Sequence, residues 1–141
     1  MTEADPTLQR LEDQISWYDR KSNHCQRVYK YLKIIEIVAA ALVPLAAGLH
    51  LPAAATGSLG VLIAVLEGLL QLNQYHHNWI SYRSTCETLK HEKYLYLAGA
   101  GPYSHPAAAH ALLAERIESL VSQEHAKWAA GQEEAPKEKN E

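Results

Sequence analysis

The longest run of apolar residues lies in the middle of the chain, between Tyr31 and Gln74, and forms two apolar arms joined by a short loop. The first arm spans about residues 34–51, and the loop is Pro52–Ser58. The second arm begins at Leu59, or at about residue 55 when the small residues of the loop are counted with it, and continues to about residue 72. With flanking small residues, each arm offers about 18–20 largely apolar residues, which is roughly what the hydrocarbon core of a bilayer needs. A link this short predicts an antiparallel hairpin.

A hairpin that is apolar on all sides is either a membrane anchor or the buried centre of a large bundle. The chain has 141 residues, and too few of them lie outside the arms to cover both arms on every side. Glu36 and Glu67 interrupt the arms, and a carboxylate at the bilayer centre costs roughly 2–3.5 kcal/mol. The Leu, Ile and Val side chains of the second arm outweigh one such carboxylate at about −0.3 to −0.6 kcal/mol each. The membrane hairpin is therefore the favoured interpretation.

The segment before the first arm is amphipathic. Its apolar residues recur at spacings of three, four and seven, as on one face of a helix. Thr7 follows Pro6 and is the expected N-cap, and nothing between Thr7 and Gly48 forces a break. We therefore expect one long helix, with a cytosolic part at about residues 7–33. Pro44 lies inside its apolar part and should kink it, either as a tolerated membrane proline or as a hinge.

The second arm continues without a break signal into a polar segment at about residues 73–97, so we expect a second long helix. The stretch Ala98–Pro106 contains two glycines and two prolines and predicts a clear break. A third, amphipathic helix is expected at about 106–130, followed by a charged, disordered tail at 131–141. The fold class is all-α, with residues 1–130 forming a single two-transmembrane helical domain.

The distribution of charge predicts the orientation of the hairpin. Basic residues flank both of its open ends, whereas the loop Pro52–Ser58 carries no charge; these residues are Arg27, Lys30, Lys33, Arg83 and Lys90. Tyrosine, tryptophan and histidine residues accompany them as an interfacial belt. Both termini are therefore expected in the cytoplasm. The acidic, polar N-terminus has no features of a cleavable signal peptide, so insertion would use the internal hairpin.

The composition argues against several classes of function. A formal net charge of −3 gives no strong attraction to nucleic acid. No nucleophile–base constellation, phosphate-binding glycine loop or metal-type spacing is recognisable, so we expect neither an enzyme nor a bound cofactor or metal. Cys25 and Cys86 are expected to be reduced thiols. The aromatic and charged segment Trp17–Lys21 is most simply a set of helix contacts in a cytosolic bundle, with a ligand site as the alternative.

The second arm carries a stripe of small and polar residues at heptad-like spacing, opposite a face of Leu, Val and Ile. The stripe consists of Gly60, Ala64, Glu67, Gln71 and Gln74. In lipid such a stripe must face protein or water. Counted outward from the loop, Glu36 and Glu67 lie within roughly 6 Å of each other in depth. Either they pack the hairpin or an oligomer, with Glu36 near Lys33, or they belong to a carboxylate ring that lines a cation-permeable pore.

Several blocks of the sequence resemble the SLATT family, whose standalone members are known as domain of unknown function 4231. The blocks are LEDQISWYDRKS, the small-residue hairpin, NWISYRSTCETLKHEKYLYLAGAGPY and ERIESLVSQEHAKW. The resemblance covers about Leu8 to Trp128. It implies a two-transmembrane helical domain that acts as a pore-forming effector in bacterial conflict systems based on nucleotide second messengers. It also implies a cytosolic sensor or second-messenger protein as a partner.

The sequence therefore predicts a small homo-oligomeric protein of the bacterial inner membrane that acts as an ion channel or pore-forming effector. A single hairpin cannot enclose a pore, so cyclic symmetry is expected. The partners would be further copies of the chain and membrane lipid, with no nucleic acid. The alternative is a membrane-anchored or soluble helical adaptor that recruits a partner through its cytosolic bundle.

Overall fold

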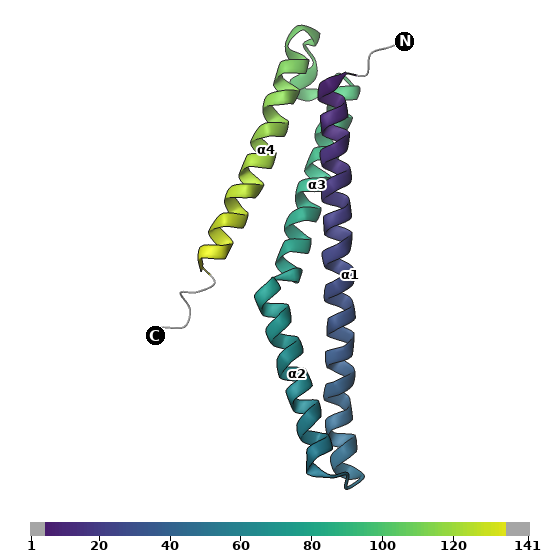
Figure 1. Cartoon of the computed structure of the whole chain (residues 1–141). Helices are drawn as coiled ribbons and strands as arrows, with labels where there is room; N and C mark the ends of the chain where they lie inside the picture. The colour runs from purple at the N-terminus through teal and green to yellow at the C-terminus, as the bar shows by residue number, and fades with distance from the viewer. Residues whose placement is uncertain (1–4, 135–141) are drawn as a thin grey trace. The chain divides into compact units, whose positions relative to one another are not determined.

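The computed structural model describes residues 5–134, and helices dominate this part of the chain (Figure 1). In chain order the elements are α1 (Pro6–Gly48), α2 (Ala53–Asn73), α3 (Tyr75–Leu97), the short 3₁₀ helix η1 (Gly101–Tyr103) and α4 (Pro106–Glu134). The predicted all-α class is confirmed. The contacts fall into two compact units. We call residues 5–20 with 81–134 the bundle unit, and residues 21–80 the hairpin unit.

The N-cap of helix α1 is Asp5, two residues before the predicted cap Thr7, and the helix begins at Pro6. The Asp5 carboxylate accepts a hydrogen bond from the Thr7 amide at 3.0 Å, and its carbonyl accepts one from the Gln9 amide at 3.0 Å. The prediction of Thr7 as N-cap was therefore wrong. Pro6 instead occupies the first helical position, where its missing N–H leaves no donor unsatisfied. The predicted unbroken helix to Gly48 is confirmed.

The turn between α1 and α2 is shorter than the predicted loop Pro52–Ser58. His50 adopts a left-handed conformation with φ of 55°, and the Leu51 amide donates to the Ala46 carbonyl at 3.0 Å. These are the marks of a Schellman motif that ends α1. Helix α2 then starts at Ala53, because the alanines that follow Pro52 are strong helix formers. Most of the predicted loop is thus the first turn and a half of α2.

The second predicted helix is interrupted at Gln74, which separates α2 from α3. Gln74 has φ of 46° and ψ of 36°, a left-handed conformation that is uncommon outside glycine. The Asn78 side chain donates to the Asn73 carbonyl at 3.1 Å and so satisfies a group released by the break. Asparagine side chains compete for backbone hydrogen bonds in this way. The expectation of one continuous helix to about residue 97 was therefore wrong at this point.

Helix α3 ends where predicted, at a second Schellman motif. Gly99 has φ of 60°, and the Ala100 amide donates to the Leu95 carbonyl at 3.0 Å. Helix α4 follows from Pro106 and continues to Glu134, so the predicted end near residue 130 was too early. Residues 131–134 of the predicted disordered tail are helical, and the rest of that tail lies outside the described residues.

The core of the bundle unit is assembled from α1, α3, α4 and η1. Its buried members are Leu11, Tyr18, Cys86, Leu89, Tyr103, Ala109, Leu113 and Ile117. Ion pairs at its surface join the same helices: Lys93 to Glu12 at 2.7 Å and Arg10 to Glu118 at 2.6 Å. The apolar stripes seen in the sequence therefore meet in one core, which accounts for the packing of three amphipathic helices.

In the hairpin unit α1 and α2 lie side by side (Figure 1), and little of their apolar surface is covered. Ala39 and Ala46 of α1 and Leu66 and Leu70 of α2 are buried. Only 11% of the most apolar 18-residue stretch of α1 is buried. The exposed large apolar residues include Ile34, Ile37, Val38, Leu42, Leu45, Val61, Leu62, Val65, Leu69 and Leu72. Both helices are long and apolar enough to cross a membrane.

Candidate functional site

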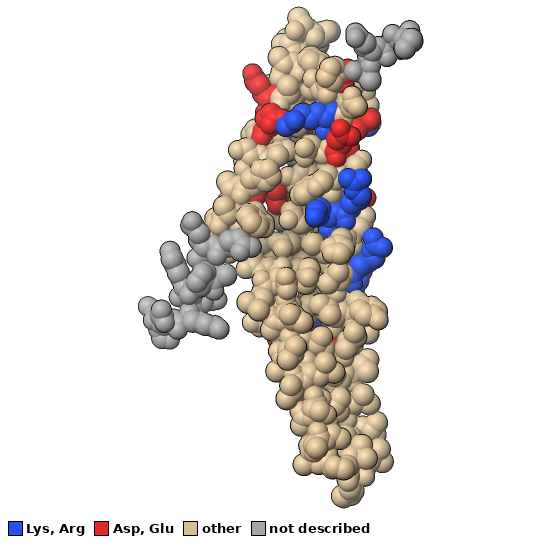
Figure 2. All heavy atoms as spheres, viewed as in Figure 1, with Lys and Arg blue, Asp and Glu red and all other residues tan. Residues whose placement is uncertain are grey.

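The apolar part of the hairpin contains no Asp, Glu, Lys or Arg between Glu36 and Glu67. On the face shown in Figure 2, the turn end of the hairpin carries no side chain of these four types. Glu36 and Glu67 are thus the charged residues that bound this stretch on its two arms. The structure brings both of them to one place.

Lys33 joins the two carboxylates. Its Nζ lies 3.1 Å from Glu36 Oε2 and 3.1 Å from Glu67 Oε2. Gln71 Nε2 donates to the other oxygen of Glu67 at 3.2 Å. We call Lys33, Glu36, Glu67 and Gln71 the hairpin cluster. Because it holds two carboxylates and one ammonium, it keeps one negative charge in excess.

The members of the hairpin cluster differ in exposure. The Glu36 side chain is 15% exposed and that of Glu67 is 42% exposed. Glu36 therefore lies between the arms, whereas Glu67 reaches the outer surface of the hairpin. In water such partly exposed pairs contribute little to stability, but in a medium of low dielectric constant the same attraction is several times stronger.

The predicted stripe on α2 lies mainly on the outer surface of the single chain. Gly60, Ala64 and Gln71 are exposed, and a Cβ added at Gly60 would meet no atom within 4 Å. Gln74 is partly exposed at the break between α2 and α3. This stripe therefore contributes little to packing within the hairpin, and it is available for contacts beyond it.

Pro44 lies on the exposed side of α1, and the helix continues through it. Proline has no amide hydrogen, so the Ala40 carbonyl loses its usual helical donor. This leaves one weak point in the first arm, on the turn side of the hairpin cluster. Whether the helix bends there during function stays a prediction.

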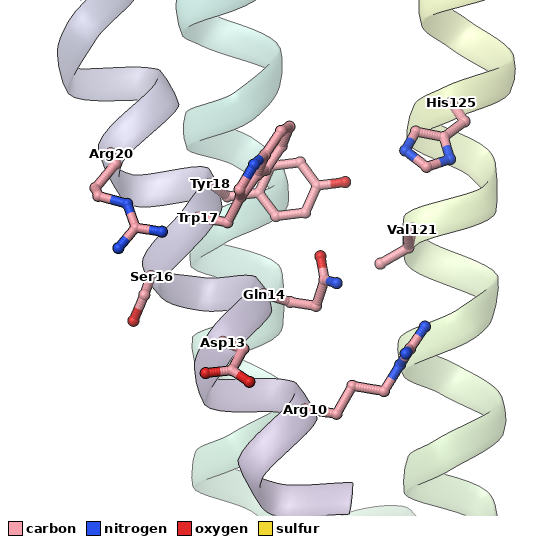
Figure 3. Close-up of a pocket in the computed structure, with 9 residues that line it drawn as sticks. All are labelled: Arg10, Asp13, Gln14, Ser16, Trp17, Tyr18, Arg20, Val121 and His125. Atoms are coloured by element: carbon pink, nitrogen blue, oxygen red, sulfur yellow. The ribbon is translucent and has the colours of Figure 1, made fainter.

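The bundle unit contains a groove of about 610 Å³ between α1 and α4. Figure 3 shows Arg10, Gln14 and the ring of Tyr18 on α1 directed toward α4, which contributes Val121 and His125. A smaller cavity next to it is lined by Trp17, Tyr18, Tyr82, Glu124, His125 and Trp128. From the sequence, Glu124 was not predicted as a site residue, and Trp128 was expected only on the apolar face of the third helix. Their spacing of four places them on one face of a helix, but the helix packed against that face cannot be read from the spacing.

Within residues 5–134, no group of three or more His, Cys, Asp or Glu residues is placed to hold a metal ion. Cys25 and Cys86 are buried free thiols. Burial raises the pKa of the Cys86 thiol, and its Sγ lies 3.6 Å from the Ile15 carbonyl oxygen. A buried thiol with a raised pKa is a poor nucleophile, so Cys86 acts as part of the core.

Comparison with known proteins gives a family for this chain. No curated protein and no solved structure matches it. The family model described as protein of unknown function DUF4231 matches residues 13–111. The match includes both arms of the hairpin, all of α2 and α3, and the beginning of α4. The chain therefore belongs to the DUF4231 family.

Proposed function

We propose that this protein is an integral membrane protein whose hairpin assembles with further copies of the chain into a cation-conducting pore. The observation that carries the proposal is the combination of an outward apolar surface with a charged cluster at its boundary. In one chain many of the large apolar side chains of both arms stay exposed, among them Ile34, Ile37 and Val65. Exposed apolar area on this scale needs lipid or protein to cover it.

The depth of the hairpin cluster supports a role inside the membrane. Helix α1 rises about 18 Å from Glu36 to its end at Gly48, and α2 about 21 Å from Ala53 to Glu67, at 1.5 Å per residue. A hydrocarbon core is about 30 Å thick. If the turn reaches the far interface, the cluster lies roughly 10 Å inside the near one. Charged groups at that depth face water or protein.

A pore would give the excess negative charge of the cluster a function. Each copy would contribute one Glu67, part of which reaches the outer surface of its hairpin. A ring of such carboxylates attracts cations and excludes anions. The stripe of Gly60, Ala64 and Gln71 would provide the close helix contacts between copies, because small residues allow backbones to approach.

We further propose that the protein belongs among the SLATT effectors of bacterial conflict systems, in the inner membrane with both termini in the cytoplasm. A cytosolic sensor or second-messenger protein would then be its partner. The support is the resemblance described above and the uncharged turn between basic open ends. Reporter fusions at residue 1, in the turn and at residue 141 test the orientation, and an outside signal from either terminus would contradict it.

The pore is tested by the reversal potential of purified protein in planar bilayers under a salt gradient. The wild type should prefer cations. Glu67→Gln keeps the shape but removes a charge, so it should reduce that preference, whereas Lys33→Gln removes the neutralising ammonium and should increase it. Glu115→Gln, an exposed residue of the bundle unit, is the control and should change nothing. Absence of conductance would contradict the pore.

Assembly is tested separately by the mass of the particles in detergent. Gly60→Leu places bulk in the stripe and should reduce the oligomer to smaller species. Val65→Leu adds bulk roughly 140° round the same helix and is the matched control. If both variants keep the wild-type mass, the stripe is not the interface. The alternative function, a membrane-anchored adaptor, would then be favoured.

A further inference from the structure

Two glutamates of the bundle unit are buried, and their surroundings differ. Glu92 is 7% exposed and lies 2.9 Å from the Arg116 guanidinium, with Tyr103 as a second donor. Glu124 is 5% exposed, and none of the ion pairs among residues 5–134 includes it. The first carboxylate has its countercharge within the fold. The second has none among residues 5–134.

The carboxylate of Glu124 is held by hydroxyl groups. Ser81 Oγ donates to its two oxygens at 2.8 and 3.0 Å, and Thr85 Oγ1 donates to one of them at 3.0 Å. Neutral donors fix the position of the carboxylate and compensate part of its lost hydration, but they leave its charge in place. A buried carboxylate without a cation is costly, so a nearby position for a cation would be favourable.

An aromatic cavity of about 190 Å³ opens beside this carboxylate. Its walls include Trp17, Tyr18 and Tyr82, whose ring centroids are 4.9 to 6.1 Å apart. Trp128, one helical turn after Glu124, is half-exposed and stands at its edge. Figure 3 shows the rings of Trp17 and Tyr18 together on α1, with the Tyr18 hydroxyl directed toward α4. Aromatic faces around a carboxylate form a site for an organic cation.

We propose that this cavity binds a small organic cation through an alkylated ammonium head group. The aromatic rings would attract the positively charged head group, and the Glu124 carboxylate, which also lines the cavity, would supply the countercharge. A metal ion fits less well, because hard cations need several oxygen ligands, and the Glu124 oxygens already accept from the hydroxyl groups of Ser81 and Thr85. The adjoining groove of about 610 Å³ shares Trp17, Tyr18 and His125 with the cavity and leaves room for the remainder of the ligand.

This site is independent of the proposed pore. All of its residues belong to the bundle unit, and it would bind its ligand whether or not the hairpin conducts. The same head group could come from a free amine or from a choline lipid, and the test separates these two sources.

The test uses the indole ¹⁵N–¹H signals of the full chain in maltoside micelles, with choline as the probe. The chain has three tryptophans. Trp17 and Trp128 line the cavity, and Trp79 lies in the hairpin unit. Choline should shift the first two signals in a saturable way and leave the Trp79 signal unchanged. Its uncharged isostere 3,3-dimethyl-1-butanol should bind at least about tenfold more weakly, because it lacks the charge.

Two variants relate the signal to the site. Glu124→Gln keeps the shape and removes the charge, and it should weaken choline binding by about tenfold or more. The exposed Glu115→Gln on the same helix should bind as the wild type does. If Glu124→Gln does not fold, Trp128→Ala removes a half-exposed wall and should also weaken binding. A choline response that persists in the presence of phosphatidylcholine identifies a soluble cation. A response to phosphatidylcholine but not to phosphatidylglycerol, with loss of the choline response when phosphatidylcholine is present, identifies a headgroup. No saturable shift with any of these probes, or equal binding of choline and its isostere, would overturn the proposal.

Discussion

The bundle unit and the hairpin unit are both helical, but they place their apolar residues in opposite ways. In the bundle unit the large apolar side chains meet in a closed core, and most ion pairs lie at the surface. In the hairpin unit many of the large apolar side chains are exposed, although Leu66 and Leu70 are buried, and the ion pairs of Lys33 lie partly between the arms. The first arrangement is that of a protein in water and the second that of a protein in lipid.

Helix α1 makes this difference visible within one element. Leu11 and Tyr18, in its first part, are 0% and 1% exposed. Ile34 and Ile37, further along the same helix, are both 60% exposed. The helix is regular throughout, so the change in exposure does not come from its local structure, and it is what the proposed membrane hairpin requires. Substitutions of the same kind in the two units should therefore have different effects.

The largest expected effect is on stability. Leu113→Ala removes a fully buried side chain of the bundle core and should lower the free energy of unfolding by about 2–5 kcal/mol. Leu62→Ala in the hairpin removes an exposed side chain and should cost under about 1 kcal/mol in detergent. Thermal unfolding in maltoside, followed by circular dichroism, compares the two. Equal losses would mean that the hairpin surface is covered in the purified protein.

The second effect is on membrane insertion. Leu62→Asp places a carboxylate in the charge-free stretch of the hairpin and should oppose insertion by about 2–3.5 kcal/mol. Leu97→Asp, at an exposed position of the bundle unit, is the matched control and should not change insertion. The measurement is the share of protein that stays with membranes after carbonate extraction. If Leu62→Asp remains there like the wild type, the hairpin does not lie in lipid.

The sequence predicted the helices well where a long apolar run or a short cluster of helix-breaking residues marks them. The apolar run and the break at Ala98–Pro106 were sufficient for the order of elements, because periodicity and glycine–proline signals act over a few residues. The breaks at His50 and Gln74 were misplaced or missed. Both positions have a left-handed backbone conformation although neither residue is a glycine. They depend on backbone hydrogen bonds that cannot be inferred from residue type.

The candidate sites divide in the same way. The nearness of Glu36 and Glu67 follows from counting residues outward from one turn, since a hairpin fixes the depth of its arms. The contact of Glu124 with Ser81 and Thr85 could not be derived by counting residues along the chain. Residues 98–105 separate α3 from α4, and no regular helix connects the two registers. Three amphipathic helices can meet in more than one order. Only the structure shows which faces meet.

A third prediction concerns the paired glutamate of the bundle unit. Tyr103→Phe removes the hydroxyl that donates to Glu92, while the Arg116 ion pair remains. The loss of one hydrogen bond to a buried charged acceptor should cost about 1.5–3 kcal/mol, which overlaps only the lower part of the range of about 2–5 kcal/mol expected for Leu113→Ala. Thermal unfolding of the variant measures it. A loss well above about 3 kcal/mol would contradict the prediction and would mean that the Arg116 ion pair does not hold Glu92 when the Tyr103 hydroxyl is absent.

The smallest effect at neutral pH is expected from Tyr18, and it grows only in alkali. Burial, followed by the charge of Glu124 and the neighbouring Tyr82, raises the pKa of Tyr18 to about 12. The unfolded chain has a tyrosine pKa of about 10. Below about pH 10 both states keep the proton, so this contribution to stability is fully present. Above it the unfolded state loses its proton first, and stability falls until the folded pKa is passed.

Tyr18→Phe tests this sign. Burial also raises the pKa of Tyr103, so the variant should keep part of the alkaline loss and remove the part that belongs to Tyr18. Its melting temperature should therefore fall less steeply than that of the wild type between about pH 10 and pH 12. The removed part is at most about 2–3 kcal/mol, since one pKa unit corresponds to 1.36 kcal/mol. Parallel melting curves over this range would show that the Tyr18 proton does not distinguish the folded from the unfolded state, and therefore that burial and the charge of Glu124 do not raise the pKa of Tyr18.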